Sequence, residues 1–547
     1  MANRQTTAKM TSNTTSASNL LKKKRKLEGK REALARKLAD LDAEIIKAQS
    51  DYGELCNKSS PILALPVEVT CLIFRETFST IAPTETEDPN YQAFKLTEVD
   101  ISHVCRKWRS IAISLPILWT CFYYFGSKAS AATIDRLEVY LDRSKTSLLE
   151  LWFEFRGTST REEALHRDAL EKAIMHVDRW RLFTIFSSSE TEAKSSWNRE
   201  VVTLLKPLCA PNLEHFALFP DVPHGNALPT AYWQTAQQEL QPGILMEGAP
   251  KLRSVWTDTI FHVAPLSNVT TLRIESGSNS FDMIISMASF RAMLTMPTLE
   301  NLSLNDAVCT EPPPSHPEPL HMNRLKHLRF SNDLLCNLLP DIQAPLLETL
   351  IIHNGMIEAE YYTDARRAGE PYTFPSLKTV ALIDGACENR ANMWYFARMT
   401  RNATQVTITQ MYQEEGILQA IDDLPEKEEG FWPNLRTLIC DVETWYDDDF
   451  SVLLRIARRW DGYKRGLTLK MPKTQAAQWK TLPSPSQATY DMVSSFCTIE
   501  ELVADDLRDQ GPWPPGEEET LDRRLDFFGA DPFRTSGRGL AFHLTYA

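Results

Sequence analysis

The stretch Pro297-Thr-Leu-Glu-Asn-Leu-Ser-Leu304 carries the pattern Pro-x-Leu-x-x-Leu-x-Leu, which decides the fold. Its last two leucines stand two residues apart, the spacing of side chains on one face of a β-strand. The other clear copies are Leu213-Phe216-Leu218, Leu252-Val255-Thr257, Val269-Leu272-Ile274, Leu325-Leu328-Phe330, Leu347-Leu350-Ile352, Leu377-Val380-Leu382 and Leu435-Leu438-Cys440. Weaker copies are Leu148-Leu151-Phe153, Trp180-Phe183-Ile185 and Ile499-Leu502-Ala504. This recurrence predicts a stack of equivalent units.

The intervals between copies vary. They run from 17 to 39 residues between Leu213 and Leu377, and the next interval, of 58 residues, leaves room for a degenerate copy near Val406. Amphipathic helices occupy several gaps, for example at Leu170 and Ile174, and such helices return a chain to the next parallel strand. We therefore expect residues 126–509 to form an α/β solenoid that resembles irregular leucine-rich repeats, with parallel strands on its concave face.

Glycine follows several strands at the same offset. Ser276-Gly277, Asn354-Gly355 and Asp384-Gly385 stand where the chain must turn out of the strand. We expect glycine there because such a turn needs a positive φ. Regular leucine-rich repeats carry Asn or Cys at this position, so the regular ladder is absent.

The side chains between the repeated leucines alternate to the opposite face of each strand, where a partner would bind. Trp and Arg are the residue types that most often anchor interfaces. We therefore predict that this face binds a protein substrate through five side chains, with Trp256, Arg273 and Arg329 as the main anchors beside His327 and His353.

Residues 58–125 predict a small all-α module. Leu65-Pro66 places a proline at a helix start, and Val69, Leu72, Ile73, Phe74 and Phe78 follow at helical spacing. This stripe is too wide for a short helix to bury alone. A second helix over residues 101–112 is expected to cover it, and a loop over 80–98 joins the two.

The module resembles an F-box, in the F-box-like form that is abundant in mushroom-forming fungi. The resemblance rests on Leu65-Pro66 in the first helix, on the sequence VCRKWR at 104–109 and on SLPILW at 114–119, and it covers about 60 residues. The long insert between the helices departs from the family.

The resemblance implies a helical module that docks on a Skp-type adaptor, and through it on a cullin-RING (SCF) ubiquitin ligase complex, while the C-terminal repeats select the substrate. Carried over to this chain, the residues that would supply the adaptor contact and the module's own core are Leu65, Pro66, Val69, Ile73, Ile101, Val104, Cys105 and Trp108. The sequence does not divide these residues between the two roles.

The N-terminal residues predict a disordered tail over 1–19 and a basic helix over 20–57. Apolar residues stand at seven-residue intervals: Leu20, Leu27, Leu34, Leu41, Ala48 and Leu55. Leu38, Ile45 and Tyr52 fall four residues after three of them, so a coiled-coil seam is filled from Leu34 onward. Self-association through residues 34–55 is one expectation, and a helix folded back on its own domain is the other. Lys22 to Lys26 reads KKKRK, either a nuclear-import signal or a solvated helix end.

Composition narrows the function classes. With 547 residues and 43% hydrophobic residues, the chain is globular and large enough for several units. The net charge of −13 argues against a nucleic-acid binder. No apolar run suits a membrane span, and the ten cysteines, without a CxxC pair, indicate reduced thiols in a cytoplasmic or nuclear protein.

Motifs for catalysis, metals or cofactors are missing. The chain has no GxSxG, glycine-rich phosphate loop or HExxH, and its eleven histidines are scattered. We therefore expect a non-catalytic protein without cofactor or metal. The leading hypothesis is a substrate receptor of a ubiquitin ligase; the alternatives are a leucine-rich-repeat scaffold whose F-box-like unit binds no adaptor, and an enzyme of undetected type. Residues 510–547 are expected to be a linker and a C-terminal cap.

Overall fold

The computed structural model describes residues 2–80, 96–156, 160–188, 195–219, 242–257, 263–275, 283–305, 307–309, 318–331, 333–357, 372–387, 390–410, 417–422, 432–442, 452–458, 466–481, 486–502, 513–516 and 533. The chain divides into two compact units. The first consists of Met1–Thr77 and Val99–Ile113, and the second of Phe78–Glu98 and Ser114–Ala547. Of the linker and C-terminal cap expected over residues 510–547, only residues 513–516 and 533 are among those described.

The first unit is helical. Its elements are α1 (Ala2–Lys58), the short 3-10 helix η1 (Pro61–Ala64), α2 (Val67–Thr80), α3 (Thr97–Val104) and α4 (Arg106–Ser114). As predicted, α2 starts directly after Pro66, and the Pro66 carbonyl accepts the amide hydrogen bond of Thr70 at 3.1 Å.

The second helix of the expected hairpin is broken into α3 and α4 at Cys105. The Cys105 thiol accepts a hydrogen bond from the Trp108 amide at 3.5 Å, and the Cys105 carbonyl accepts one from the Arg109 amide at 2.9 Å. Cys105 therefore caps the start of α4, a role that helical spacing alone does not reveal.

The disordered tail expected over residues 1–19 is part of α1, which begins at Ala2. Thr, Ser and Asn are weak helix formers, but extending an existing helix costs far less than nucleating one. The strongly helical residues 20–58 supply that nucleus.

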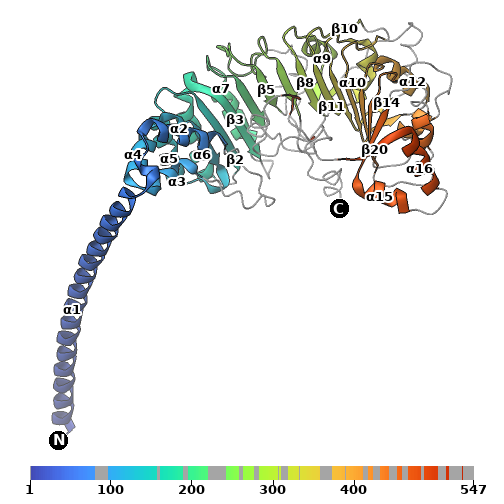
Figure 1. The fold of residues 1–547 in the computed structure, drawn as a ribbon. Helices are drawn as coiled ribbons and strands as arrows, with labels where there is room; N and C mark the ends of the chain where they lie inside the picture. Colours follow the sequence, from blue (N-terminus) through green and yellow to red (C-terminus); the bar gives the residue numbers. More distant parts are fainter. Residues whose placement is uncertain are drawn as a thin grey trace. The chain divides into compact units, whose positions relative to one another are not determined.

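The second unit contains a large parallel sheet, in which fourteen strands of the described residues pair in the order of the chain (Figure 1). The strands are β1 (Cys121–Phe125), β2 (Leu149–Arg156), β3 (Trp180–Ser188), β4 (His215–Phe219), β5 (Ser254–Thr257), β6 (Thr271–Ile274), β8 (Asn301–Asn305), β11 (His327–Ser331), β13 (Thr349–His353), β15 (Thr379–Ile383), β17 (Gln405–Gln410), β18 (Thr437–Val442), β19 (Leu467–Met471) and β20 (Cys497–Glu501). The clear copies of the sequence pattern all lie at these strands, and the degenerate copy near Val406 is β17.

Helices lie between the strands in the chain. They are α5 (Ala131–Arg143), α6 (Thr160–Ile174), α7 (Ser195–Leu205), α9 (Met287–Leu294), α10 (Asp333–Leu338), α12 (Arg390–Met399), α13 (Ile417–Asp422), α15 (Lys473–Thr481) and α16 (Ser486–Phe496). Short strand pairs follow some turns: β7 (Met283–Ile285) with β9 (Ala307–Cys309), β10 (Leu320–His321) with β12 (Ile342–Gln343), and β14 (Met356–Ile357) with β16 (Ala386–Cys387). The structure is therefore mixed α/β with a parallel sheet.

Strand register separates the two faces of the sheet. Leu302 pairs with both Leu272 and Leu328, so the repeated apolar positions of neighbouring strands lie in one row. At the start of the sheet this row faces the helices, since Phe122 contacts Tyr140 of α5 edge-on at 5.2 Å. The intervening residues form a second row on the opposite face, which we call the inner face. This alternation confirms the sequence-based assignment of sides.

The proline of the repeat belongs to a turn before the strand. The amide of Leu299 donates to the Met296 carbonyl at 3.2 Å, and the amide of Leu347 donates to the Ala344 carbonyl at 3.2 Å. Pro297 and the equivalent Pro345 therefore stand second in a four-residue turn, where their fixed φ is favourable. The sequence pattern thus encodes a turn followed by a strand.

The glycines after β13 and β15 have a different role from the one expected. The positive φ values belong to Asn354 (47°) and Asp384 (51°), the residues before them. A Cβ on Gly355 would lie 2.7 Å from the Cys336 Sγ atom, so Gly355 is needed for close packing. Gly277 lies outside the described residues.

The two ends of the sheet were harder to predict. The FYYF run at 122–125, which was expected to belong to the all-α module over residues 58–125, lies within the first strand of the sheet, β1. Beside it the buried Trp119 contacts Tyr140 edge-on at 5.1 Å. Strand β19 was missed because it has alternating Leu467, Leu469 and Met471 but no leading leucine three residues earlier.

Candidate functional sites

The outward side of α2 is apolar. Val69, Leu72 and Ile73 are 39%, 54% and 37% exposed, and their three- and four-residue spacing puts them on one side of the helix. In the same unit, Val104 at the end of α3 is 60% exposed. Isolated exposed apolar residues are common, but several on one helix face indicate a surface that another protein can cover.

The inward side of α2 holds the unit together. Phe74 is buried and meets Trp108 of α4 edge-on, with ring centroids 5.0 Å apart. The Lys107 ammonium group of α4 donates to the carbonyls of Leu63 and Leu65, at 2.7 Å and 3.1 Å, and so holds the start of the module against α4. The stripe expected to pack as one face is therefore divided between the two sides of α2.

This division distinguishes exposed from buried positions among the residues that the resemblance assigned jointly to the adaptor contact and the module core. Among the predicted adaptor-contact residues, the structure exposes Pro66, Val69, Ile73 and Val104, half-buries Leu65, Cys105 and Trp108, and buries Ile101. Sequence reasoning did not select Leu72, although its spacing from Val69 places it in the same exposed group.

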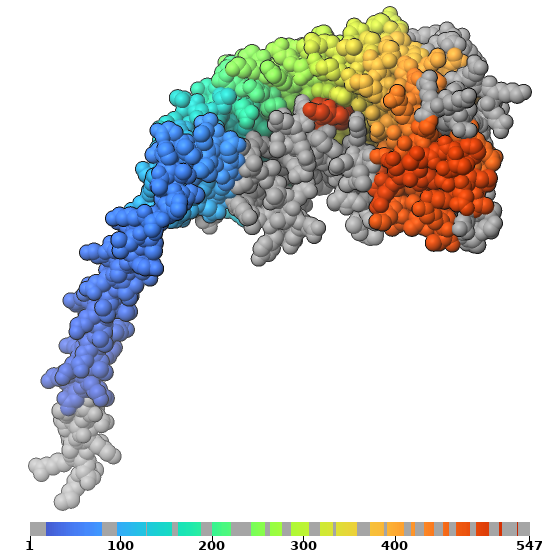
Figure 2. Space-filling model, viewed as in Figure 1, coloured from blue at the N-terminus to red at the C-terminus, as the bar shows by residue number. Residues whose placement is uncertain are grey.

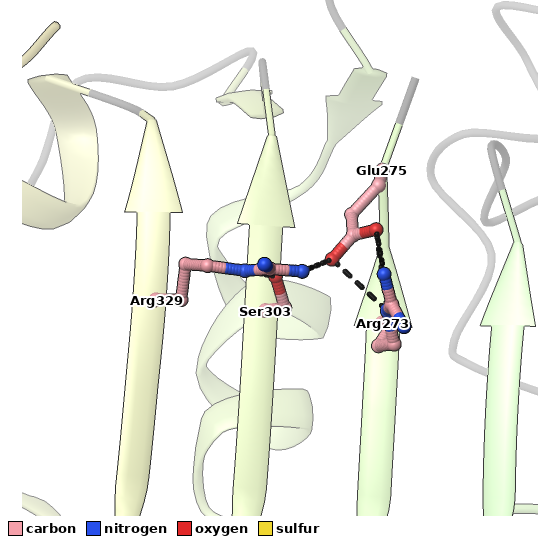
Figure 3. A network of polar contacts seen from close by, with 4 residues as sticks. All are labelled: Arg273, Glu275, Ser303 and Arg329. Atoms are coloured by element: carbon pink, nitrogen blue, oxygen red, sulfur yellow. Dashed lines mark hydrogen bonds and ion pairs between the residues drawn. The ribbon is translucent and has the colours of Figure 1, made fainter. Parts of the chain in front are cut away.

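The inner face holds a buried charge cluster (Figure 3). Arg329 donates from Nη2 to Glu275 Oε1 at 2.8 Å and from Nε to the Ser303 hydroxyl at 2.9 Å. Arg273 donates from Nη2 to Glu275 Oε2 at 3.0 Å. The side chains of both arginines are only 1% exposed, and that of Glu275 is fully buried. One carboxylate therefore binds two guanidinium groups from different strands.

Aromatic rings cover the two guanidinium groups. Arg273 lies over the ring of Trp256, at 3.6 Å from its centroid. Arg329 lies 4.7 Å from the ring centroid of Trp513 and 4.3 Å from that of Phe533. Trp513 and Phe533 come from the C-terminal residues, and Figure 2 shows a red C-terminal segment against the yellow and green strands.

The C-terminal residues also cover neighbouring strands. Trp513 is 2% exposed and packs in a cluster with Ile351 of β13 and with Ala381 and Ile383 of β15. Its ring lies edge-on to His327, at 6.3 Å. The ring of Phe533 lies 4.5 Å from that of His353. Part of the segment expected to be a linker is thus packed on the inner face.

The five predicted substrate-binding residues lie on the inner face as expected, but they are not open to a partner. Trp256, Arg273, Arg329 and His353 are buried, and His327 is half-buried. The alternation of a strand shows which side a residue faces, but it cannot show that distant residues of the same chain lie over that side. Substrate contact by these five residues stays a prediction.

Partly exposed ion pairs lie where several strands of the sheet begin. Glu300 accepts from Lys326 and from Arg324, each at 2.7 Å, and Glu348 accepts from Lys378 at 2.6 Å. Hydrogen bonding by the lysine is the main cause of the lowered pKa of both carboxyl groups. Pairs of this kind are solvated and weak, so they suit solubility better than binding.

The described residues contain no metal cluster, disulfide or membrane-spanning helix. In the part of the chain that the structure describes, no group of His, Cys, Asp or Glu side chains is arranged to hold a metal ion. The nine cysteines described there are free thiols. None of the described helices combines the length and the apolar character that a membrane crossing requires.

A scan against protein-family models finds no match to this chain, and a search of curated proteins finds no match either.

Proposed function

We propose that this protein is an F-box-type substrate receptor. In this proposal the helical unit binds a Skp-type adaptor, and the second unit, a leucine-rich-repeat-like solenoid, binds a protein substrate. The chain then contributes no catalytic step. It raises the effective concentration of the substrate at a cullin-RING ubiquitin ligase.

The observation that supports the proposal most is the apolar outward side of α2. Val69, Leu72 and Ile73 are exposed while Phe74 and Trp108 form the core of the unit, so a partner can cover these three residues without unfolding it. They lie in the stretch whose sequence resembles an F-box. Fully burying one such side chain is worth about 1.5 to 3 kcal/mol, so three of them can anchor an interface.

Substrate binding requires one further step in this proposal. Trp513 and Phe533 lie over Arg329, so a substrate reaches that part of the inner face only when the C-terminal residues leave it.

The test is capture of a Skp-type adaptor by the full chain and by two variants of α2. Val69→Glu puts a charge on the apolar side, whereas Arg75→Glu changes an exposed residue elsewhere on the same helix. We expect wild type and Arg75→Glu to capture the adaptor and Val69→Glu to lose at least about tenfold in affinity, because a buried unpaired charge is costly.

Circular dichroism of each variant shows whether the fold is intact. If folded wild-type protein captures no adaptor, the receptor proposal is wrong, and the alternative of a repeat scaffold without adaptor binding takes its place. Equal capture by wild type and Val69→Glu would place the contact elsewhere and remove the support that the outward side of α2 gives.

A further inference from the structure

Helix α1 presents an unpartnered apolar seam along most of its length. The large seam side chains are each more than half exposed: Leu20, Leu27, Leu34, Leu38, Leu41, Ile45, Tyr52 and Leu55. They occupy the a and d positions of a heptad, with Leu34, Leu41, Ala48 and Leu55 at d and Leu38, Ile45 and Tyr52 at a. Most of the stability of a helix comes from packing such a face, so this seam needs a partner.

The helical unit contacts α1 on its other side. Arg106 of α4 donates to the Ser50 hydroxyl at 2.9 Å and forms an ion pair with Glu54. Ser50 and Glu54 occupy heptad positions f and c, which point away from the a and d seam. The chain thus holds α1 without using its seam, and the expectation of a helix folded back through that seam is not met.

We propose that the seam pairs with a second copy of this chain, in a parallel and in-register two-stranded coiled coil over residues 34–55. This inference does not depend on the receptor proposal. Leucine at the d positions with a β-branched residue such as Ile45 at an a position favours two strands. Lys24 and Arg31 at the preceding a positions end the apolar seam on the N-terminal side.

The charges beside the seam fit a parallel pair. In such a pair, each g position faces the e position five residues later in the other copy. Lys37 then faces Asp42 of the second copy, and Lys23 faces Glu28. The remaining g positions face Ala35, Gln49 or Cys56, so no like charges meet.

The antiparallel arrangement is less favourable. No antiparallel register matches the whole seam of residues 34–55: the one that sets Ile45 against Ala48 of the other copy leaves Leu34 beyond the end of the other helix, and g positions then face g positions. This register brings Glu44 opposite Asp51 and Lys37 opposite Lys58. Like charges at these flanking positions oppose pairing, which selects the parallel orientation.

Pairing has a direct consequence for binding. The seam of 22 residues is about 33 Å long at 1.5 Å per residue. Because α1 and α2 belong to one compact unit, a parallel pair brings the helical units of both copies to the same end of the coiled coil. The assembly then presents two copies of the apolar side of α2, and two linked sites bind a paired partner more tightly than one site does.

Sedimentation equilibrium of the full chain tests the pairing. We expect wild type at twice the mass of one chain, Leu41→Asp as a monomer, and the control Lys47→Asp, which changes the c position of the next heptad, as a dimer. A monomeric wild type at micromolar concentration overturns the proposal, and so does a Leu41→Asp variant that is still a dimer.

Disulfide formation tests the orientation. In a Cys56→Ser background, Leu41→Cys puts a thiol on the seam and Lys47→Cys puts one on the outer side. A parallel in-register pair brings position 41 of both copies together within disulfide reach, so Leu41→Cys should cross-link between copies under mild oxidation and Lys47→Cys should not. Peptide mapping identifies the link. Failure of Leu41→Cys to cross-link, or equal cross-linking of both variants, contradicts the proposed orientation.

Discussion

Arg329 donates a hydrogen bond to Glu275 at 2.8 Å across the intervening strand β8, and both side chains are buried. The contact joins residues 54 positions apart in the chain. Because Glu275 also binds Arg273, this carboxylate links β6 to β11, and Ser303 of the intervening β8 joins the cluster through Arg329.

We predict that Glu275→Gln destabilises the second unit by about 3 to 5 kcal/mol, because the substitution removes the carboxylate that two buried guanidinium groups share. Glu300→Gln is the matched control. It removes a carboxylate that two solvated cations share and whose side chain is 21% exposed, so its cost should be clearly smaller, about 1 kcal/mol. Denaturant unfolding of the two variants measures both values. Similar losses of stability would contradict the conclusion that the buried carboxylate of Glu275 stabilises the unit more than the carboxylate of Glu300 does.

Trp513→Ala should destabilise the protein by about 3 to 5 kcal/mol, the usual cost of emptying a buried tryptophan site. Trp513→Phe keeps an aromatic ring over Arg329 and should cost clearly less. Thermal unfolding compares the two. If the alanine variant is as stable as wild type, the packing of the C-terminal residues on the inner face is not present in solution.

Gly355→Ala should destabilise the sheet by about 1 to 3 kcal/mol, because the new methyl group would overlap Cys336 and Ile352. Gly29→Ala has the opposite expectation. Nothing lies within 4 Å of the added methyl group in α1, so the variant should stabilise that helix by about 1 kcal/mol. Unfolding curves measure the change in stability of Gly355→Ala, and the helical circular dichroism signal measures the effect of Gly29→Ala. A neutral Gly355→Ala would show that the turn has room for a side chain.

Phe74→Ala and Leu72→Ala separate the two sides of α2. Removing the buried Phe74 ring should cost about 3 to 5 kcal/mol, since its contact with Trp108 is lost. Removing the exposed Leu72 side chain should change stability by less than about 0.5 kcal/mol. Urea unfolding followed by far-ultraviolet circular dichroism measures both, and a large cost for Leu72→Ala would mean that its side chain is packed within the chain.

His215 makes the stability of the second unit depend on pH. Burial lowers the pKa of His215 from 6.5 to about 4, and Arg181 and Arg253 add to the effect. Between pH 6.5 and pH 4, His215 is therefore protonated in the unfolded chain and neutral in the folded chain. The stability contributed by a neutral His215 is complete above pH 6.5 and is lost as the pH falls toward 4.

The difference in unfolding free energy between wild type and His215→Gln isolates this contribution from that of the carboxyl groups. We expect the difference between their unfolding free energies to change as the pH falls from 6.5 to 4 and to be constant above pH 7. Parallel curves over the whole range would mean that His215 titrates normally in the folded protein.

Sequence periodicity predicted much of the sheet. The Pro-x-Leu-x-x-Leu-x-Leu pattern located the strands because its proline belongs to a turn and its last leucines to one strand face, and both are local properties of the chain. The break at Cys105 was missed because it depends on a thiol cap, and β19 because its leading leucine is absent. The sequence placed the candidate binding residues on the correct side of each strand, but it could not show which of them are exposed, and a residue must be exposed to bind a partner.

The sequence by itself determined the order of the elements, the two alternating rows of the sheet and the seam of α1, because each follows from the spacing of side chains along a strand or helix. Only the tertiary structure decided which of these surfaces are open. It turned Val69 and Ile73 outward, buried Phe74, and placed Trp513 over Arg329. The physical reason is that exposure depends on contacts between residues far apart in the chain, such as Phe74 with Trp108 and Arg329 with Trp513, and the local spacing of side chains does not specify these contacts.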